Sequence, residues 1–192
     1  MSTNVTWHDG EVGREDRPSL GATVWLTGLS GSGKSTVGVA LERLLVSAGR
    51  PAYRLDGDNL RHGLNADLGF SAEARAENVR RTGEAAILLA DAGVVAIACL
   101  VSPYLRDRDR VRNRHAESGV PFYEVFVDTP LALAESRDPK GHYKKARAGE
   151  MKGFTGIDDP YEAPPKPDLR IETQGSSVES CVERIVAMLA PR

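Results

Sequence analysis

The sequence predicts an α/β fold with a mostly parallel sheet, and three observations carry this prediction. Short apolar, β-rich runs alternate with longer segments of helical period, which is typical of strands joined by helices. The run 94–100 is apolar at every position, as expected of a central strand that is covered on both faces. A glycine-rich loop, 28–33, directly follows the first run and precedes the first helical segment.

Each element follows from its local pattern. The predicted strands are 23–27, 52–55, 94–100, 122–127 and 169–172. The predicted helices cover 34–48, 71–92, 104–118, a short segment that begins at Leu131, and 178–189. Gly49 and Gly93 follow the last periodic residues of two of these helices and are predicted helix stops, whereas Ser71 is a predicted helix start.

The length of 192 residues predicts one domain. Residues 1–21 are polar and have no period, so we expect an N-terminal arm, followed by a single domain over 22–192. Within that domain, 138–167 contains five prolines and four glycines and shows no clean period. A segment of this length without a period is typical of a functional loop, so we predict a lid at 138–167.

The charge balance excludes two classes of partner. The chain has 25 Lys and Arg against 27 Asp and Glu, a net charge of -2, which argues against a protein that coats nucleic acid or an anionic membrane. Its longest apolar run, 94–101, is far shorter than the ~20 residues of a membrane-spanning helix. Cys99 and Cys181 have no CxxC spacing, and the N-terminus has no apolar signal segment. We therefore expect a cytoplasmic protein.

The loop between the first strand and the first helix carries the strongest chemical signal. Its sequence GLSGSGKST, residues 28–36, fits the phosphate-binding pattern GxxxxGK[ST]. Glycines let backbone N–H groups surround phosphate oxygens, Lys34 can reach the β- and γ-phosphates, and the Ser35 hydroxyl can bind Mg²⁺. The predicted ATP-binding residues of this loop are Gly28, Ser30, Gly31, Ser32, Gly33, Lys34, Ser35 and Thr36.

The rest of the sequence distinguishes between classes of nucleotide-binding protein. A GTPase would carry an NKxD guanine motif, which the sequence lacks. A motor ATPase would end an apolar strand in paired acids, but here the third strand ends in Leu100-Val101-Ser102-Pro103. The small size and the lid-like segment before the last strand favour a small-molecule kinase.

Acidic and basic residues after the second predicted strand mark a candidate binding region for the acceptor of the phosphoryl group, called the acceptor side below. Asp56 and Asp58 follow the second strand, where carboxylates can accept the proton of an attacking hydroxyl or hold Mg²⁺ through water. The alternative is a solvated loop in which Asp58 caps a helix. Four arginines nearby offer planar donors for phosphate or sulfate oxygens: Arg61, Arg75, Arg80 and Arg81. The alternative is that they are solvated surface charges paired with Glu73 and Glu77, which is favoured for Arg80 or Arg81 taken singly. The lid adds a cationic stretch: Arg137, Lys140, Lys144, Lys145, Arg147 and Lys152.

Read together, these segments resemble the adenylylsulfate kinase family. The resemblance rests on NVTWH, GLSGSGKST, DGDNLRHGL, DLGFSAEARAENVRR, LVSPY, RDPKGHYKKARAGEMKGFTGIDDPYEAP and LRIET, which follow one another in the family's order over nearly the whole chain. It implies a P-loop kinase fold with five parallel strands flanked by helices, and a homodimer. It also implies transfer of the γ-phosphoryl group of MgATP to the 3′-hydroxyl of adenosine 5′-phosphosulfate (APS), giving 3′-phosphoadenylylsulfate (PAPS).

The resemblance also implies roles for individual residues. Asp58 should face the 3′-hydroxyl as base or orienting acceptor, while Lys34 and Lys140 should screen the transferring phosphate. Arg137 should lie against the adenine of ATP. The residues implied to bind APS are Asp58, Arg61, Phe70, Arg75, Asn78, Ser102, Lys152 and Phe154, with Phe70 and Phe154 sandwiching its adenine.

Three points stay open at this stage. Ser102 lies in the family's SPY turn and is either a phosphoserine carrier or a hydroxyl that positions substrate; direct in-line transfer needs no carrier, which favours positioning. His142 stands where the family's lid usually has leucine. The alternative functions are a P-loop kinase for another small acceptor, such as a nucleoside or sugar acid, and a non-catalytic nucleotide-sensing module.

Overall fold

A parallel sheet organises the molecule. In the computed structural model, which describes residues 4–6, 8 and 10–190, five strands pair in the order β2-β3-β1-β4-β5, and every pairing is parallel. The strands are β1 (Ala22–Thr27), β2 (Ala52–Asp56), β3 (Val95–Cys99), β4 (Phe122–Asp128) and β5 (Leu169–Glu172). The predicted α/β fold with five parallel strands is confirmed.

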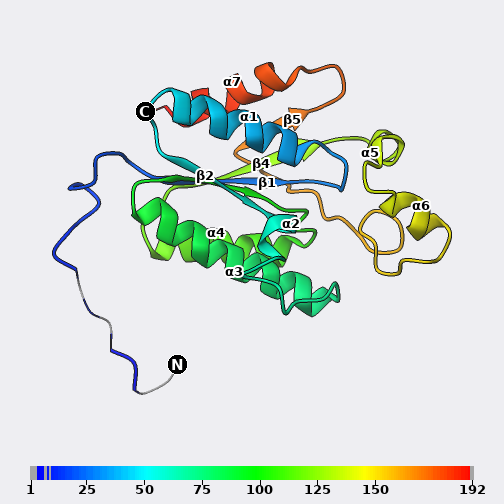
Figure 1. Ribbon diagram of the computed structural model, residues 1–192, viewed down its shortest axis with the longest axis horizontal. Helices are drawn as coiled ribbons and strands as arrows, with labels where there is room; N and C mark the ends of the chain where they lie inside the picture. The colour runs from blue at the N-terminus through cyan, green and yellow to red at the C-terminus, as the bar shows by residue number, and fades with distance from the viewer. Residues whose placement is uncertain (1–3, 7, 9, 191–192) are drawn as a thin grey trace.

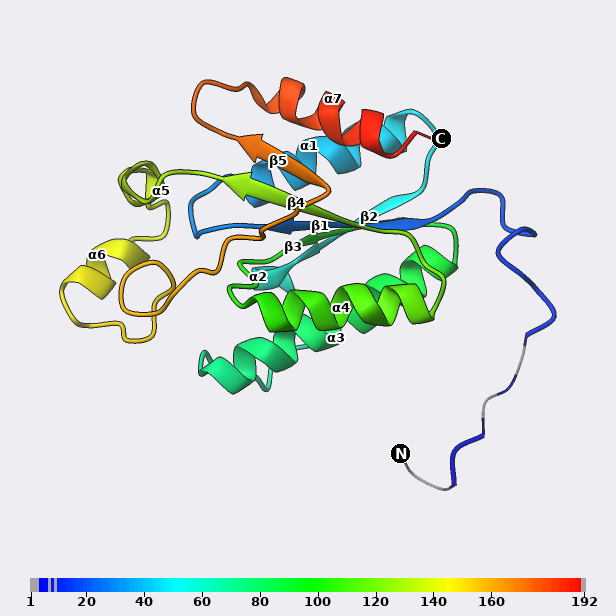
Figure 2. The ribbon, with the colours of Figure 1, turned by 180° about the vertical axis from the view of Figure 1, so that it is seen from behind.

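Helices cover both faces of the sheet. They are α1 (Lys34–Ser47), α2 (Gly57–Leu60), α3 (Ala72–Asp91), α4 (Leu105–Glu117), α5 (Leu131–Arg137), α6 (His142–Arg147) and α7 (Val178–Met188). Helices α1 and α7 pack on one face, and α3 and α4 pack on the other (Figures 1 and 2). The central strands β1 and β3 are buried at every position, which explains the unbroken apolar sequence of β3 and the largely apolar sequence of β1.

Local sequence explains where the long helices begin. The Ser71 hydroxyl accepts a hydrogen bond from the backbone N–H of Ala74 at 3.2 Å and caps α3, as predicted. Helix α1 begins directly after Gly33, whose left-handed φ of 100° redirects the chain out of the glycine-rich loop. The helical pattern therefore gave the start of both long helices correctly.

Two short helices differ from the sequence expectation. Helix α2 follows β2 immediately, and helix α6 lies inside 138–167, where no period was expected. With four and six residues, neither helix is long enough to produce a recognisable periodic pattern. Asp138 supports α6, because its carboxylate accepts a hydrogen bond from the backbone N–H of Lys144 at 3.1 Å.

The carboxyl ends of all five strands meet at one edge, because the strands are parallel. The loop 28–33 leaves β1 there, and Asp56 and Asp128 close β2 and β4 at the same edge. Helices α5 and α6 and the chain that follows them extend beyond this edge (Figures 1 and 2). In open parallel sheets this edge is where ligands bind, so the predicted site residues are brought to the expected place.

The N-terminal segment runs along the opposite end of the sheet. Part of the predicted arm, residues 1–3, 7 and 9, lies outside the described residues. The Arg14 guanidinium donates to the Asp91 carboxylate at 2.7 Å and to the carbonyls of Ser118 and Gly119, at the ends of α3 and α4. None of the helices in the described part of the chain has the length and apolarity to cross a membrane.

Candidate active site

The glycine-rich loop leaves no room for side chains at two of its positions. A Cβ added to Gly28 would lie 2.5 Å from the carbonyl oxygen of Val127, and one added to Gly31 would lie 2.7 Å from that of Ala134. Both residues also have positive φ, 153° and 73°. The loop therefore packs tightly against β4 and α5, and its conformation requires glycine.

Lys34 lies across this loop. Its ammonium donates to the carbonyl oxygens of Gly28 at 2.9 Å and Leu29 at 2.6 Å, and its side chain is buried. Burial lowers the pKa of Lys34 to about 8, although Asp56 and Asp58 act in the opposite direction. A lysine with this pKa beside a glycine loop is suited to bind an anion, because the negative charge of the anion raises the pKa and keeps the lysine protonated.

The two acids after β2 have different environments. Asp56 is buried, and its Oδ2 accepts hydrogen bonds from the Ser35 hydroxyl at 2.8 Å and from Arg54 at 2.5 Å. Its Oδ1 accepts the backbone N–H of Asp58 at 3.1 Å and caps α2. The sequence alternative that made Asp58 the cap is therefore wrong, because Asp56 takes that role and Asp58 remains available.

Asp58 faces the lid segment. Its side chain is 64% exposed and forms an ion pair with Lys140, which is 48% exposed. Both groups act on the pKa of Lys34, Asp58 raising it and Lys140 lowering it. The structure therefore brings Lys34, Asp58 and Lys140 into one electrostatic cluster at the sheet edge, although they come from three separate segments.

Arg61 and Phe70 contact each other. The guanidinium of Arg61 lies 4.1 Å from the centroid of the Phe70 ring and donates to the carbonyl oxygens of Leu68 and Gly69. Phe70 is 71% exposed, which is unusual for a phenylalanine. Phe70 is therefore not a core residue, and its ring is free to meet a ligand on its open face.

Arg75 joins α3 to the lid segment and to α4. It donates to the Gly153 carbonyl at 3.1 Å and the Thr155 hydroxyl at 3.0 Å, and it forms an ion pair with Asp159 at 3.0 Å. It also donates to the Tyr104 hydroxyl at 3.1 Å. One turn further along α3, Asn78 is buried and accepts a hydrogen bond from Asn65 at 2.9 Å.

Ser102 is buried rather than open to the site. Ser102 is only 3% exposed. Its hydroxyl donates to Thr27 Oγ1 at 3.0 Å and accepts from the indole N–H of Trp25 at 3.1 Å. Among the non-glycine residues in the described part of the chain, Ser102 alone has a φ in the left-handed region, at 40°. These bonds place its hydroxyl inside the turn after β3.

Arg137, Lys152 and Phe154 are the remaining predicted site residues. Arg137 and Phe154 contact other parts of the site: Arg137 lies within 3.4 Å of the carbonyls of Gly31 and Ser32, and the Phe154 ring packs edge-on against Tyr143 at 4.9 Å. Lys152 is exposed. Among the described residues, no ring contact joins Phe70 to Phe154. The two rings predicted to sandwich the adenine therefore do not touch each other.

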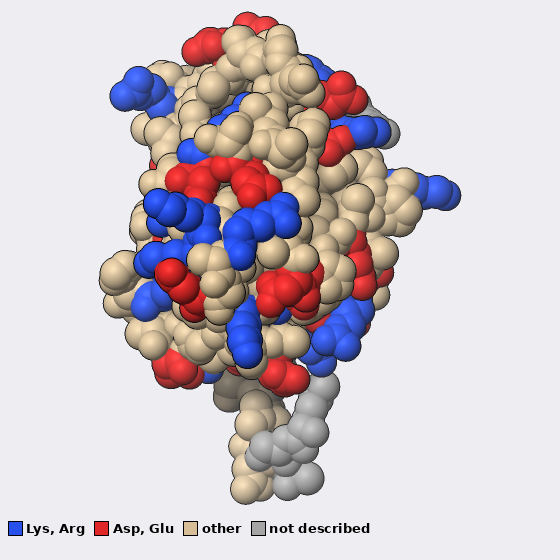
Figure 3. Space-filling view, turned by 90° about the vertical axis from the view of Figure 1, so that its right-hand side faces the viewer, with Lys and Arg blue, Asp and Glu red and all other residues tan. Residues whose placement is uncertain are grey.

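The face at the sheet edge carries both signs of charge. Figure 3 shows basic and acidic side chains interleaved on it rather than a uniform basic surface. Several lid cations have acidic partners there: Lys140 pairs with Asp58, and Arg147 pairs with Glu135 at 2.9 Å. Two of the six basic residues of the cationic stretch are therefore paired with acids of the protein in this structure.

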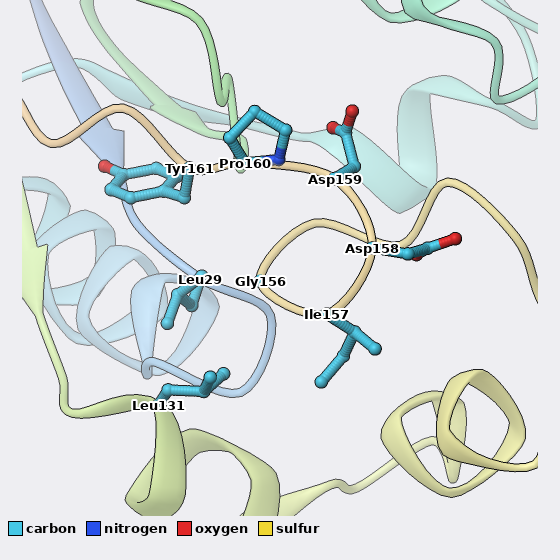
Figure 4. A pocket seen from close by; sticks show the side chains of 8 residues that line it. All are labelled: Leu29, Leu131, Gly156, Ile157, Asp158, Asp159, Pro160 and Tyr161. Atoms are coloured by element: carbon cyan, nitrogen blue, oxygen red, sulfur yellow. The ribbon is translucent and has the colours of Figure 1, made fainter.

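A cavity of about 530 Å³ lies beside the glycine loop (Figure 4). Its walls are Leu29, Leu131 and the segment 156–161, and Leu29 approaches Gly156 so closely that a Cβ there would meet the leucine at 3.1 Å. None of the residues predicted to bind substrate lines this cavity. The cavity therefore lies between the glycine loop and the segment 156–161, and the predicted acceptor residues are not part of its walls.

Sequence reasoning missed several polar residues of the site. Tyr143 was unassigned, yet its hydroxyl donates to the Ser30 carbonyl at 2.9 Å and ties α6 to the glycine loop. Tyr104 donates to Asp159, and burial together with this bond raises the pKa of Tyr104. The signal that could have found them was their position inside the segments LVSPY, for Tyr104, and RDPKGHYKKARAGE, for Tyr143, which carried the resemblance.

In the described part of the chain, no cluster of three or more His, Cys, Asp or Glu side chains is arranged to hold a metal ion by itself. The oxygen donors that lie together at the glycine loop are the Ser35 hydroxyl and the Asp56 carboxylate. Any cation at this edge would therefore share its coordination with a ligand or with water.

Comparison with known proteins agrees with this geometry. The family model described as adenylylsulphate kinase matches residues 20–172. The adenylyl-sulfate kinase of Saccharomyces bayanus is 54% identical over 98% of this chain and 95% of its own length. The solved APS kinase of Mycobacterium tuberculosis in complex with AMPPNP and APS is 53% identical, with a TM-score of 0.87 over 90% of this chain and 99% of that one.

A more distant structure shows the same fold. The hexameric APS kinase of Thiobacillus denitrificans is 32% identical, with a TM-score of 0.67 over 89% of this chain and 29% of that one. The matched residues of the family model include the glycine loop, Asp58 and the whole lid segment. On these grounds, the chain belongs to the adenylylsulfate kinase family.

Proposed function

We propose that this chain transfers the γ-phosphoryl group of ATP to the 3′-hydroxyl of APS, and that Lys34, Asp58 and Lys140 carry the transfer. The observation that supports this assignment best is the meeting of these three groups at the carboxyl edge of the sheet. Asp56 beside them is buried and bound by Ser35 and Arg54, whereas Asp58 is 64% exposed and paired with Lys140, so Asp58 is the carboxylate that an acceptor can reach.

The transfer forms one bond and breaks another. The 3′-oxygen of APS attacks the γ-phosphorus, the bond from this phosphorus to the β–γ bridging oxygen breaks, and ADP leaves. The proton of the 3′-hydroxyl passes to the Asp58 carboxylate. For this to occur, Lys140 gives up its ion pair with Asp58 and turns to the transferring group, where it and Lys34 stabilise the spread negative charge.

The site also suits Mg²⁺. Oxygen donors are the ligands that Mg²⁺ prefers, and the Ser35 hydroxyl and the Asp56 carboxylate lie 2.8 Å apart at the glycine loop. We assign these two residues to the ion, Asp56 directly or through water. When bound with ATP, Mg²⁺ neutralises part of the phosphate charge.

The acceptor side uses cations and rings. Arg61 and Arg75 present guanidinium groups to the phosphosulfate and ribose, and Asn78 and Lys152 add hydrogen-bond donors. Phe70, with its open face, and Phe154 hold the adenine by stacking. On the opposite side of the glycine loop, Arg137 takes the adenine of ATP, which its position beside Gly31 and Ser32 supports.

The low pKa of Lys34 predicts proton uptake on ATP binding. Above about pH 8 the free protein holds Lys34 largely neutral, and bound phosphate raises its pKa, so binding at pH 8.5 takes up a proton. Calorimetric titration of ATP in two buffers of different ionisation enthalpy measures this uptake. Lys34→Arg, which stays protonated, is expected to abolish it, and an unchanged uptake in that variant would remove Lys34 as the source.

The burial of Ser102 predicts a structural effect. Ser102→Ala leaves the indole N–H of Trp25 without its acceptor, so the free energy of unfolding is expected to fall by about 1–3 kcal/mol while kcat stays within about threefold. Ser102→Gly is the control for the positive φ and is expected to lose less stability than Ala. Denaturant unfolding and steady-state assays measure both. A collapse of kcat in a folded Ser102→Ala protein would instead favour a substrate-facing hydroxyl, either as a carrier or as a positioning group.

ATP turnover tests the proposed function. Purified protein with MgATP is expected to form ADP at a rate that depends on added APS. The alternatives are tested in the same assay with a nucleoside or a sugar acid in place of APS. ADP formation that responds to one of these and not to APS would overturn the proposal, and no turnover with any acceptor would favour the nucleotide-sensing alternative.

The family resemblance implies a homodimer, the composition leads us to expect a cytoplasmic protein, and we retain both as part of this proposal. A family member named as hexameric supports self-association within the family, in a chain much longer than this one. Sedimentation at several protein concentrations measures the assembly, with a species of twice the 20.7 kDa monomer mass expected.

A further inference from the structure

The turn that carries Phe154 is closed by a single carboxylate. Asp158 accepts the backbone N–H of Gly153 on one oxygen at 2.7 Å and that of Phe154 on the other at 2.6 Å. The Phe154 carbonyl in turn accepts the backbone N–H of Ile157 at 3.0 Å. The backbone of Phe154 is therefore held through both its N–H and its carbonyl by residues that follow it.

The Phe154 ring has a second support. It packs edge-on against Tyr143 at 4.9 Å, and Tyr143 is fastened to the glycine loop through the Ser30 carbonyl. Edge-on packing alone does not fix the position of the Phe154 ring, because this contact contains no hydrogen bond. The two hydrogen bonds to Asp158 remove that freedom, because they fix the backbone from which the ring projects.

The neighbouring acid, Asp159, binds different partners. Asp159 accepts from Arg75 and from the Tyr104 hydroxyl and so ties the turn to α3 and α4. Figure 4 shows the carboxylates of Asp158 and Asp159 pointing in different directions, both away from Leu29 and Leu131. Gly153 takes part in both sets of contacts. Its N–H donates to Asp158, and its carbonyl accepts from Arg75, which also pairs with Asp159.

We propose that Asp158 is a positioning residue that sets the place of Phe154 over the acceptor base and thereby the affinity for the acceptor nucleotide. This inference rests on the proposed function, in which Phe154 stacks on the adenine of APS. Asp158 acts through Phe154, since both of its oxygens are engaged by backbone N–H groups. Those N–H groups hold the pKa of Asp158 below its usual range, so it remains ionised at working pH.

Kinetics of four variants test this role. Asp158→Ala is expected to raise the KM for APS at least about fivefold, and no more than Phe154→Ala does, with the KM for ATP unchanged within about twofold. Asp158→Asn keeps one acceptor oxygen and is expected to fall between wild type and Ala. The double variant Asp158→Ala/Phe154→Ala is expected to match Phe154→Ala alone, because the two residues act as one unit.

Glu150→Ala is the matched control. It removes an exposed acid from the same lid and is expected to leave both KM values unchanged, which separates the loss of charge from the loss of the turn. Thermal unfolding identifies a variant that no longer folds; if Asp158→Ala is one, Asp158→Asn carries the test.

Two results would overturn the inference. One is an unchanged KM for APS in folded Asp158→Ala and Asp158→Asn proteins. The other is a double variant in which the two losses multiply, because that would make Asp158 independent of Phe154. Failure of the proposed function is distinguishable from both, since the wild-type protein would then form no APS-dependent ADP at all.

Discussion

Asp58→Asn is expected to lower kcat by about 10²–10⁴-fold while leaving the affinity for ATP nearly unchanged. Asparagine keeps the size of the side chain but cannot take the proton of the 3′-hydroxyl. The glycine loop is untouched, since Ser35 and Arg54 bind Asp56 and not Asp58. Steady-state kinetics give kcat, and calorimetric titration gives the dissociation constant of ATP.

Asp67→Asn is the matched control for this change. The Asp67 side chain is 62% exposed, close to the 64% of Asp58, and it too is paired with a basic residue, Arg81. Because it lies outside the cluster of Lys34, Asp58 and Lys140, its variant is expected to keep kcat within about twofold. Wild-type turnover in Asp58→Asn, or an equal loss in both variants, would contradict the role of Asp58.

Arg75→Ala is expected to lower kcat/KM for APS about 10²-fold, with the KM for ATP within about twofold. This residue holds the carbonyl of Gly153, the hydroxyls of Thr155 and Tyr104, and the Asp159 carboxylate. Its removal therefore loosens the lid from α3 and also takes a cation from the acceptor side. Assays with one substrate varied and the other saturating separate the two KM values.

Two variants sharpen the interpretation of Arg75. Arg75→Lys keeps the charge but not the planar fork, so it is expected to recover only part of the loss. Arg80→Ala removes an exposed arginine of the same helix that pairs with Glu77 at 2.7 Å, and it is expected to have no effect on either KM. Full activity in Arg75→Lys would show that charge alone matters and would contradict the account of the fork.

The sequence predicted what local pattern determines. The apolar run of β3 and the loop 28–33 are contiguous signals, and each predicts its structure without knowledge of the rest of the chain. The glycine loop also predicts its own chemistry, because phosphate binding depends on consecutive backbone N–H groups.

Properties that depend on distant partners were not predictable in this way. Asp56 and Asp58 differ because Ser35, at the start of another helix, and Arg54 bind Asp56, whereas Asp58 is exposed and pairs with Lys140. The direction of the Ser102 hydroxyl follows from a positive φ and from Trp25 on a neighbouring strand. Such differences arise when the strands assemble, and no spacing within one segment encodes them.

The lid illustrates the same limit. Its basic residues were visible in the sequence, but their acidic partners come from other segments: Asp58 lies beside Lys140, and Glu135 precedes α6 and pairs with Arg147. The charge of Lys140 and Arg147 is therefore offset within the fold, and it becomes available to a ligand only when these two pairs exchange partners.

The most direct test of the central claim is the position of the transferred phosphate. ³¹P NMR of the product formed from ATP and APS is expected to show a new phosphomonoester coupled to the 3′-hydrogen of the APS ribose, in amounts equal to the ADP produced. Phosphate at another ribose position, release of inorganic phosphate in place of transfer, or ADP formation without change to APS would contradict the account.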